Sequence, residues 1–373
     1  MRIAIDASTI STQGGPRAYV LGLLDALGRI DRENDYVVFY NDPIHLGRFP
    51  WAREIVLPGK SPLRRLWREH VALPLACRRE GVDLLHGPKS ALPFWSPCPT
   101  LVTLHDLIPI THPETETRAA QLYWRLQIPI AARRASFIIT DSEHARREIV
   151  DMFGVPNQRI AVTALGYPPS MNESPDPLRF AELRQCYCLP ESYILYVGTI
   201  QPRKNLDMLI EAYARLRGEG STTQKLVIVG RKGWLYDTLF ARISALGLED
   251  EVIFTGFVPD EELPHLYDGA CLFVYLSLFE GFGLPPLEAM ARGIAVVTSN
   301  TTSLPEVVGE AGITVSPRNL DEVIAGMRRV LTDAELAKQL GQAGKMRARQ
   351  FSWERTARET LALYRLVAGV ARR

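Results

Sequence analysis

Residues 275–298 read Tyr-Leu-Ser-Leu-Phe-Glu-Gly-Phe-Gly-Leu-Pro-Pro-Leu-Glu-Ala-Met-Ala-Arg-Gly-Ile-Ala-Val-Val-Thr, and this segment indicates how the chain is built. The apolar run Cys271–Tyr275 that leads into it has the composition of a buried β-strand. Pro286 suits the first turn of a helix and Gly293 suits its end, so we predict a helix between them. Ile294–Thr298 then reads as the next strand. A strand, a loop, a helix and a strand in this order indicate a parallel α/β sheet.

The loop before this helix has the features of an anion site. The first backbone N–H groups of a helix lack partners within it, and the helix dipole is positive at that end. Gly281 and Gly283 let a ligand approach the backbone, and such a site suits a diphosphate. Glu280 before the helix and Glu288 in its predicted first turn can each accept two hydrogen bonds from a sugar diol, which describes a nucleotide sugar. The simpler alternatives are an exposed loop acid for Glu280 and a helix-stabilising charge for Glu288.

Composition limits the other possibilities. The chain has 373 residues, 46% of them hydrophobic, which is enough for two domains with real cores. Its net charge of +1 gives no reason to expect a nucleic-acid partner. The five cysteines are odd in number and scattered, which fits a reducing compartment better than a disulfide framework. With neither a signal peptide nor a membrane-length apolar run, the chain is expected to be cytoplasmic.

The first half of the chain repeats the α/β pattern. Arg2–Asp6 reads as a strand, Gly14-Gly15 lies in a loop, and Arg17–Leu27 reads as a helix with one apolar face. The Gly-x-Gly-x-x-Gly fingerprint of dinucleotide-binding oxidoreductases is absent here. Thr100–His105 reads as a strand that ends in a histidine, and ligands of open α/β sheets collect at the carboxyl ends of strands. His105 is therefore a candidate for chemistry, with a structural, hydrogen-bonded histidine as the alternative.

The second half contributes cations at equivalent places. Tyr193–Val197 reads as a strand, and Arg203-Lys204 follow in the loop before the next helix. Arginine can grip a diphosphate through two hydrogen bonds, and lysine adds a point charge. Lys232 lies in another loop after a strand and is a weaker candidate for the same anion. No Asp-x-Asp pair occurs in the chain, so we expect fixed cations, with no metal and no other cofactor, to neutralise the phosphates.

The stretch 60–80 has a different character, because basic residues alternate there with leucines, a valine and a tryptophan. This pattern suits docking on an anionic membrane surface, which would place the protein peripherally on the inner face of the cytoplasmic membrane. It also suits binding of a phosphate-bearing acceptor. An ordinary solvated helix is the third interpretation.

The motif around Glu280 and Glu288 reads Glu-Gly-Phe-Gly-Leu-Pro-x-Leu-Glu-Ala-Met-Ala-x-Gly and resembles the signature of retaining glycosyltransferases of the GT-B fold, family 4. The resemblance implies that Glu288 holds the ribose hydroxyls of the nucleotide and that Glu280 contacts the transferred sugar. It further implies that the backbone amides of Phe282, Gly283 and Leu284 face the sugar and the phosphate.

The resemblance covers the rest of the chain as well and implies a role for each remaining candidate. The loop with Gly14 and Gly15 would border the diphosphate and the acceptor, and His105 would lie between donor and acceptor. Arg203 and Lys204 would bind the diphosphate. The turn around Val258 would meet the base, and Ser142 is a weaker candidate for a sugar contact. Family members often carry an arginine where this chain has Thr199, and we expect Arg203 to replace it.

The resemblance also sets the domain and substrate expectations. Two Rossmann-like domains are expected: residues 1–168 together with a terminal helix at about 355–373, and residues 178–354, with 169–177 as the linker. The sequence looks most like bacterial polysaccharide and O-antigen mannosyltransferases, which implies GDP-mannose as donor and a saccharide or lipid-linked saccharide as acceptor. The alternatives are a UDP-sugar donor, a UDP-sugar isomerase, and a catalytically idle sugar-nucleotide-binding protein.

Overall fold

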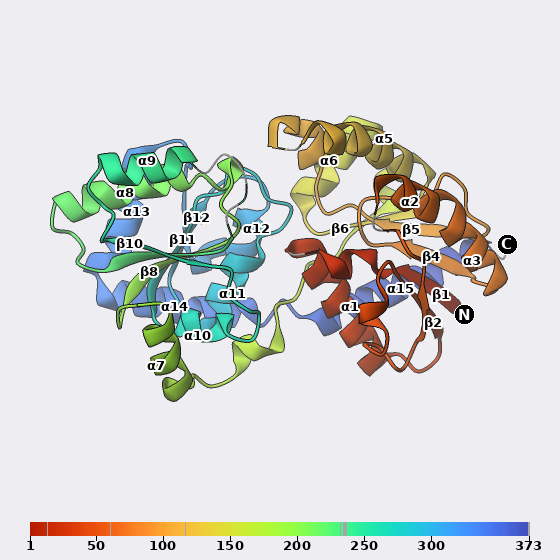
Figure 1. The fold of residues 1–373 in the computed structure, drawn as a ribbon, viewed down its shortest axis with the longest axis horizontal. Helices are drawn as coiled ribbons and strands as arrows, with labels where there is room; N and C mark the ends of the chain where they lie inside the picture. The colour runs from red at the N-terminus through yellow and green to blue at the C-terminus, as the bar shows by residue number, and fades with distance from the viewer. Residues whose placement is uncertain (13, 60, 116, 232, 234–236, 372–373) are drawn as a thin grey trace. The chain divides into compact units, whose positions relative to one another are not determined.

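The computed structural model describes residues 1–12, 14–59, 61–115, 117–231, 233 and 237–371. They form two compact units, one of residues 1–166 with 351–373 and the other of residues 167–350 (Figure 1). In each unit, helices cover both faces of a parallel sheet. The predicted α/β class with two Rossmann-like halves is confirmed.

The first unit contains a seven-stranded sheet of order β3-β2-β1-β4-β5-β6-β7, in which every pairing is parallel. The strands are β1 (Arg2–Asp6), β2 (Asp35–Tyr40), β3 (Arg53–Val56), β4 (Leu84–Gly87), β5 (Thr100–Thr103), β6 (Phe137–Thr140) and β7 (Ile160–Val162). The strand order reverses between β1 and β4. Ligands of open parallel sheets bind at such a point, outside the carboxyl ends of the strands.

The second unit contains a six-stranded parallel sheet of order β10-β9-β8-β11-β12-β13. Its strands are β8 (Tyr193–Val197), β9 (Lys225–Val229), β10 (Val252–Gly256), β11 (Ala270–Tyr275), β12 (Val296–Ser299) and β13 (Ile313–Val315). Here the order reverses between β8 and β11. The loops that follow these two strands carry the cation pair and Glu280, so the topology brings the two candidate groups to one place.

Helices flank each sheet. In the first unit they are α1 (Gly15–Ile30), α2 (Pro62–Trp67), α3 (Leu73–Arg79), α4 (Ile108–Thr111), α5 (Arg118–Arg134), α6 (Glu143–Phe153) and α15 (Trp353–Ala371), with a π-turn at Arg68–Ala72 joining α2 to α3. In the second they are α7 (Pro177–Cys186), α8 (Leu206–Gly218), α9 (Asp237–Ala245), α10 (Leu263–Asp268), α11 (Leu284–Arg292), α12 (Leu304–Val308), α13 (Leu320–Thr332) and α14 (Ala334–Ala348). None of the helices within the described residues combines the length and the hydrophobicity of a membrane span.

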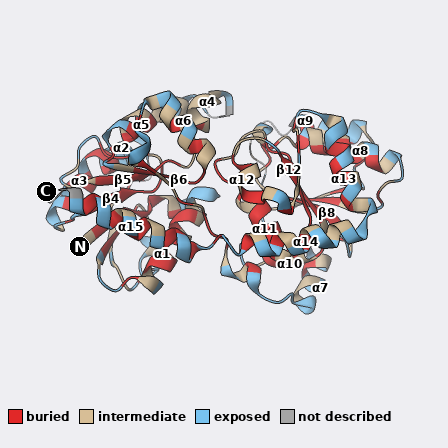
Figure 2. Cartoon of the chain, turned by 180° about the vertical axis from the view of Figure 1, so that it is seen from behind, coloured by how far each residue is buried: buried red, intermediate tan, exposed pale blue. Residues whose placement is uncertain are grey.

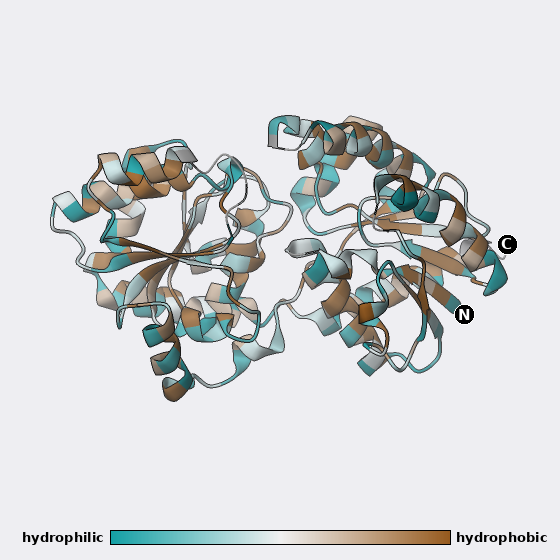
Figure 3. Ribbon diagram, in the orientation of Figure 1, coloured by the Kyte–Doolittle hydropathy of each residue, from teal (hydrophilic) through white to brown (hydrophobic). Residues whose placement is uncertain are grey.

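The cores lie where the strands are most apolar. β-branched and aromatic residues fill the central strands, and Figure 3 shows these strands as the hydrophobic centre of each unit. Figure 2 shows the same strands buried beneath helices whose outer faces are exposed. A strand covered on both faces needs a continuous apolar run, and β8 (Tyr-Ile-Leu-Tyr-Val) is buried along its whole length.

Helix α15 returns to the first unit after the second is complete. Trp353 packs so closely on α1 that a Cβ atom at Gly22 would lie 2.2 Å from its ring, and one at Gly166 would lie 2.1 Å from its backbone N. Thr356 Oγ1 donates to the carbonyl of Ala164 at 2.7 Å, which ties the start of α15 to the last loop of the sheet. Trp353 itself is 7% exposed, so the helix closes this core.

Residues 169–177, predicted as the linker, lie in the second unit. Arg292 of α11 donates to the carbonyl of Glu173 at 2.6 Å and to that of Met171 at 3.3 Å, which holds this segment on the second unit. Pro169–Asn172 forms a short 3-10 turn there. The boundary between the units lies instead at Gly166 and Tyr167, and again at Gln350 and Phe351.

Candidate functional site

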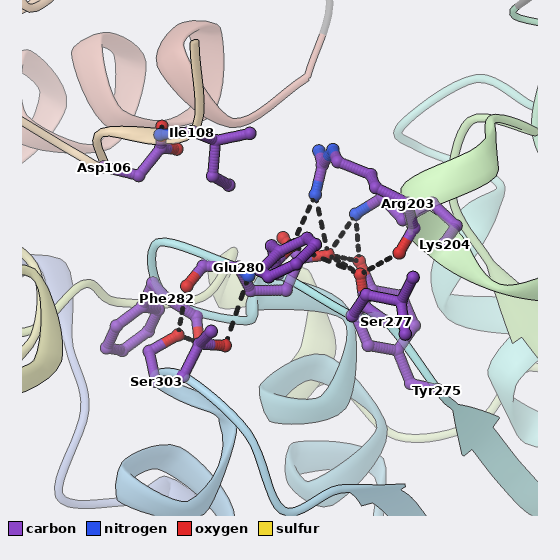
Figure 4. A network of polar contacts seen from close by, with 12 residues as sticks. Asp106, Ile108, Arg203, Lys204, Tyr275, Ser277, Glu280, Phe282 and Ser303 are labelled. Atoms are coloured by element: carbon purple, nitrogen blue, oxygen red, sulfur yellow. Dashed lines mark hydrogen bonds and ion pairs between the residues drawn. The ribbon is translucent and has the colours of Figure 1, made fainter. Parts of the chain in front are cut away.

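Glu280 lies at the centre of a polar cluster in the second unit (Figure 4). Four side chains point at its Oε1 atom. Arg203 Nη1 lies 3.0 Å away, Ser277 Oγ donates at 2.6 Å, Tyr275 OH donates at 2.9 Å, and Lys204 Nζ forms an ion pair with the same oxygen. The cluster therefore joins the loop after β8, which carries both cations, to the loop after β11.

The cations control the charge of this carboxylate. Burial opposes the ionised form of Glu280, but Arg203 and Lys204 outweigh it and lower the pKa of the carboxyl to about 2. All four of these contacts use Oε1. Glu280 is thus an anion whose Oε1 atom is held in place by two cations and two hydroxyl groups.

The backbone of the loop is held as firmly as the side chain. Ser303 Oγ donates to the carbonyls of Glu280 at 2.9 Å and Phe282 at 2.7 Å, and the Glu280 N–H donates to Thr302 Oγ1 at 3.2 Å. Arg203 Nη1 donates to the carbonyl of Phe279 at 2.9 Å. Side chains from two neighbouring loops therefore fix the path of residues 279–282, as a preorganised site requires.

Helix α11 begins at Leu284, two residues before the predicted start at Pro286. The reason is that N–H groups in the first turn have no helical partner, so prolines at the second and third positions remove no helical bond. Gly283 is the N-cap with φ +123°, and no side chain caps this end in the described structure. The backbone at Phe282, Gly283 and Leu284 therefore stands at a positively polarised helix end, as predicted for an anion site. The predicted end of the helix is confirmed, since Gly293 is the C-cap in the left-handed conformation.

Glu288 lies in the second turn of α11, because the helix starts earlier than predicted. Its side chain is 9% exposed and accepts a hydrogen bond from Tyr267 OH at 2.9 Å. Burial outweighs that hydrogen bond and raises the pKa of Glu288 to about 7. A carboxyl beyond the first turn and buried at this energetic cost is not explained by stabilisation of the helix dipole. It has the character of a ligand-binding group.

His105 is the matching group of the first unit, two residues beyond the end of β5. Its Nδ1 atom lies 2.7 Å from Asp141 Oδ2, and its Nε2 atom lies 3.3 Å from the carbonyl of Pro88. Burial disfavours the charged ring, but the Asp141 carboxylate outweighs it and raises the pKa of His105. Asp141 therefore sets the orientation of the imidazole and stabilises its protonated form.

His86, at the end of β4, is by contrast a structural histidine. It is fully buried, with Nδ1 2.7 Å from Tyr364 OH and Nε2 2.8 Å from Thr103 Oγ1. Burial lowers its pKa to about 3, so the ring is neutral. Both of its nitrogen atoms are occupied by the protein itself.

The remaining candidates lie in different local environments. Gly14 is the N-cap of α1 with φ +97°, and a Cβ atom at Gly14 or Gly15 would meet nothing within 4 Å, so the backbone there is open. Ser142 is the N-cap of α6 and accepts the Ala145 N–H at 3.2 Å, which accounts for the residue. Val258 is buried just after β10, and Lys232 lies outside the described residues.

The candidates thus fall into two sets, each described within its own unit. In the second unit, Arg203 and Lys204 contact Glu280 directly, and the α11 N-terminus adjoins it. In the first unit, His105 is joined by an aspartate that the sequence did not single out. The other missed residues are the donors to the two glutamates, Tyr267, Tyr275 and Ser277. Polar residues at the end of an apolar strand were the available signal for the last two.

Comparisons with known proteins agree with this architecture. Residues 189–347 match the family described as "Glycosyl transferases group 1", and residues 13–170 match "Glycosyltransferase Family 4". The O-antigen chain mannosyltransferase B of Escherichia coli is 37% identical over 286 residues, which are 76% of this chain and 74% of that protein. The MMP alpha-(1->4)-mannosyltransferase of Mycolicibacterium hassiacum is 31% identical, over 73% of this chain and 67% of its own length. The chain spans about a third of another E. coli relative, the serotype-specific mannosyltransferase WbdA, at 32% identity and 32% of its length.

Solved structures share the fold across the whole chain. Anabaena HepE in complex with UDP-glucose superposes with a TM-score of 0.78 at 20% identity, covering 97% of this chain and 99% of that one. The sucrose-phosphate synthase of Thermosynechococcus elongatus gives a TM-score of 0.78 at 23% identity, covering 99% and 100%. With the sequence relatives and the strand-end clusters taken together, the chain belongs to glycosyltransferase family 4 and is a glycosyltransferase of the GT-B fold.

Proposed function

We propose that this glycosyltransferase moves mannose from GDP-mannose to an acceptor hydroxyl with retention of the α configuration and without a metal ion. The observation that carries the proposal is the convergence of Arg203 and Lys204 on Glu280 beside the N-terminus of α11. Cations, a helix end and an anion at one place match the charges of a sugar diphosphate. The names of several relatives support mannose as the sugar.

The cations supply the driving force for bond cleavage in this proposal. When the bond between the anomeric carbon and the β-phosphate oxygen breaks, its electron pair stays on that oxygen. Arg203, Lys204 and the amides near Gly283 stabilise the new negative charge, and such preorganised stabilisation is typically the largest catalytic contribution. The acceptor oxygen then bonds to the anomeric carbon on the face that the phosphate leaves, and its proton passes to the departing phosphate.

The two glutamates hold the ends of the donor. Glu280 keeps Oε1 on the cations and offers Oε2 to the hydroxyls of the transferred sugar. Glu288 accepts the ribose hydroxyls, and Val258 borders the base through its backbone. His105, oriented by Asp141, is the proposed catalytic group of the first unit.

The acceptor in this proposal is a saccharide or lipid-linked saccharide used for bacterial cell-surface polysaccharide. A lipid-linked acceptor would place the reaction at the inner face of the cytoplasmic membrane. The basic and apolar residues of the stretch 60–80 support this choice.

Titration calorimetry of the full chain with GDP and with UDP tests the donor. We expect GDP to bind at least about tenfold more tightly, a difference of about 1.4 kcal/mol. Tighter binding of UDP would replace GDP-mannose by a UDP-sugar.

Slow hydrolysis of GDP-mannose without acceptor tests the activity itself, since release of GDP distinguishes an enzyme from an idle binding protein. We expect the same rate in EDTA as in its absence. Loss of activity in EDTA that magnesium or manganese restores would contradict the metal-free mechanism.

A further inference from the structure

Both ring nitrogens of His105 face oxygen atoms that accept hydrogen bonds. Nδ1 lies 2.7 Å from Asp141 Oδ2, and Nε2 lies 3.3 Å from the carbonyl oxygen of Pro88. A carbonyl oxygen has no proton to donate, and an ionised carboxylate has none either. Both nitrogens therefore carry a proton when both bonds are made, and a ring with two N–H groups is the charged imidazolium.

The proton between His105 and Asp141 belongs to the ring. The ordinary pKa of histidine is about 6.5 and that of aspartate about 3.9, so an imidazole holds a proton more tightly than a carboxylate does. Burial raises the pKa of Asp141, and the charged ring of His105 opposes this rise. Asp141 is 3% exposed, and among the described residues its Oδ1 atom has no hydrogen-bond partner. Loss of the ring proton would leave this buried carboxylate without its positive partner, which is costly.

The other neighbours of the ring are compatible with its charge. The Tyr19 ring of α1 lies nearly perpendicular to the imidazole, with the ring centres 4.8 Å apart. Burial raises the pKa of Tyr19, so its hydroxyl stays neutral, and burial likewise keeps His86 of β4 neutral. Burial disfavours the charge of His105 as well, but Asp141 and then the adjacent Asp106 raise its pKa.

The two hydrogen bonds of the ring differ in strength. The bond to Asp141 is short and joins two charged groups, whereas the bond to Pro88 is long and ends on a neutral carbonyl. Lys89, which follows Pro88, pairs with carboxylates at the end of β1 and on the π-turn. The His105 side chain is 13% exposed and that of Asp141 only 2%. The Pro88 bond is thus the one that an oxygen atom of a ligand can replace.

We propose that His105 acts in the reaction as a charged hydrogen-bond donor, and that Asp141 is the residue that positions it and keeps it charged. Its Nε2–H leaves the carbonyl of Pro88 and donates to an oxygen of the sugar diphosphate. A ring that already carries both protons does not take the proton of the acceptor hydroxyl, which agrees with the proposed transfer of that proton to the departing phosphate. The inference rests on the proposed function, but its first test needs neither donor nor turnover.

Nitrogen NMR of the isotope-labelled full chain measures the charge of the ring. The two nitrogens of an imidazolium have similar chemical shifts, whereas those of a neutral ring differ widely. At about pH 7.5, about one unit above the ordinary pKa, we expect a charged His105 and a neutral His86 in the same spectrum. The signal that His105→Gln lacks identifies the residue. A neutral His105 at this pH overturns the proposal.

Asp141→Asn tests the positioning role. Asparagine keeps the shape of the side chain and loses its charge, so the titration midpoint of His105 should fall by at least about one pH unit. Asp151→Asn, which changes an exposed aspartate of α6, is the matched control and should leave that midpoint unchanged. An equal midpoint in Asp141→Asn and the parent contradicts the role of Asp141. The spectrum of the parent decides the charge even if Asp141→Asn does not fold.

The pH dependence of kcat distinguishes a charged donor from a general base. GDP release at saturating GDP-mannose should fall as the pH rises through the His105 midpoint, because the charged ring is lost, whereas a general base would give a rise. In Asp141→Asn the fall should move to lower pH by the same interval as the NMR midpoint. A merely structural role of Asp141 would lower kcat equally at every pH. That result, or a rise of kcat through the midpoint, overturns the proposal.

Addition of GDP and of GDP-mannose to the labelled protein identifies the oxygen that His105 contacts. A change of the Nε2 signal with GDP assigns a phosphate oxygen, and a change with GDP-mannose alone assigns a sugar oxygen. No change with either nucleotide, at concentrations where calorimetry shows binding, overturns the contact. Absence of nucleotide binding would instead contradict the proposed function, and the charge of His105 is measured independently of it.

Discussion

At the scale of single residues, Lys204 and Glu280 form an ion pair in which the two charges neutralise one another. Lys204 is 7% exposed and also lies against the Tyr275 hydroxyl, so its position is fixed before any donor arrives. Arg203 supplies a second cation to the same Glu280 oxygen. Removing one cation would leave the carboxylate paired with the other, so we expect the fold to tolerate a change that lowers the activity.

Lys204→Ala is expected to lower kcat by a factor of about 10² to 10³, the effect of losing one preorganised charge stabiliser. GDP release from GDP-mannose measures it. The control is Lys225→Ala, a lysine of the same unit that donates to the carbonyl of Asp250. If the rate of Lys204→Ala stays near that of the parent with an unchanged fold, the assignment of the diphosphate site fails.

Glu288 predicts a pH dependence of nucleotide binding. Burial raises its pKa to about 7, so the carboxyl becomes protonated as the pH falls through that value. Two ribose hydroxyls donate best to the ionised form, so binding is fully present above about pH 7 and weakens below it, by roughly tenfold per pH unit.

Calorimetry with GDP from pH 5.5 to pH 8.5 measures this. Glu288→Gln controls for titration of the GDP phosphates, because it retains their contribution and removes that of the carboxyl. An identical pH profile in both proteins would exclude a ribose contact by Glu288.

At the scale of elements, the sequence predicts where the strands end, but it does not predict which residues at those ends contact one another. The apolar runs and the proline and glycine near α11 located the parallel strands and the end of that helix. The pairing of His105 with Asp141 depends on β5 lying beside β6 in register, with Thr103 opposite Ile139. Sequence spacing contains no such information. Asp141 therefore could not be identified from the sequence as the partner of His105.

Other elements escaped prediction for local reasons. β3 is short and none of its residues is fully buried, so it has no apolar run to reveal it. α5 contains Pro129, and its charges are spread along most of its length. α11 begins earlier than predicted because prolines in a first turn do not mark its first residue.

The packing of α15 gives an element-scale prediction. Trp353 fills the space that Gly22 and Gly166 leave, so Trp353→Ala should cost about 3–5 kcal/mol in the free energy of unfolding of the first unit. Urea unfolding measures it. Leu366→Ala, on the exposed side of the same helix at 51% exposure, should change that free energy by less than about 0.5 kcal/mol. Equal effects of the two substitutions would mean that this contact does not stabilise the unit.

At the scale of the whole molecule, both sheets follow one plan. Each reverses its strand order once, between β1 and β4 or between β8 and β11, and buried charged residues gather at the carboxyl ends of those strands. In the second unit the charges face a proposed ligand. In the first they join the end of β1 to Arg68 and Lys89, because both cations pair with Asp6.

Two separate cores predict two responses in differential scanning calorimetry. Trp353→Ala should lower the transition of the first unit. GDP should raise the transition temperature of the second unit, because a ligand at a hundred times its Kd stabilises the folded form by about 2.7 kcal/mol. The parent and Trp353→Ala are each measured with and without GDP. A single transition that both perturbations move together would show that the units unfold as one.

The route of the chain has a consequence for how the protein is made. Residues 1–166 leave the ribosome first, but the helix that covers α1 and reaches His86 through Tyr364 is synthesised only after the entire second unit. The core of the first unit can therefore be completed only after the second unit has been synthesised, and the space that Trp353 fills beside Gly22 and Gly166 stays open until then. Incompletely folded domains expose apolar surface, so we expect the first unit to be most prone to aggregation before α15 is made.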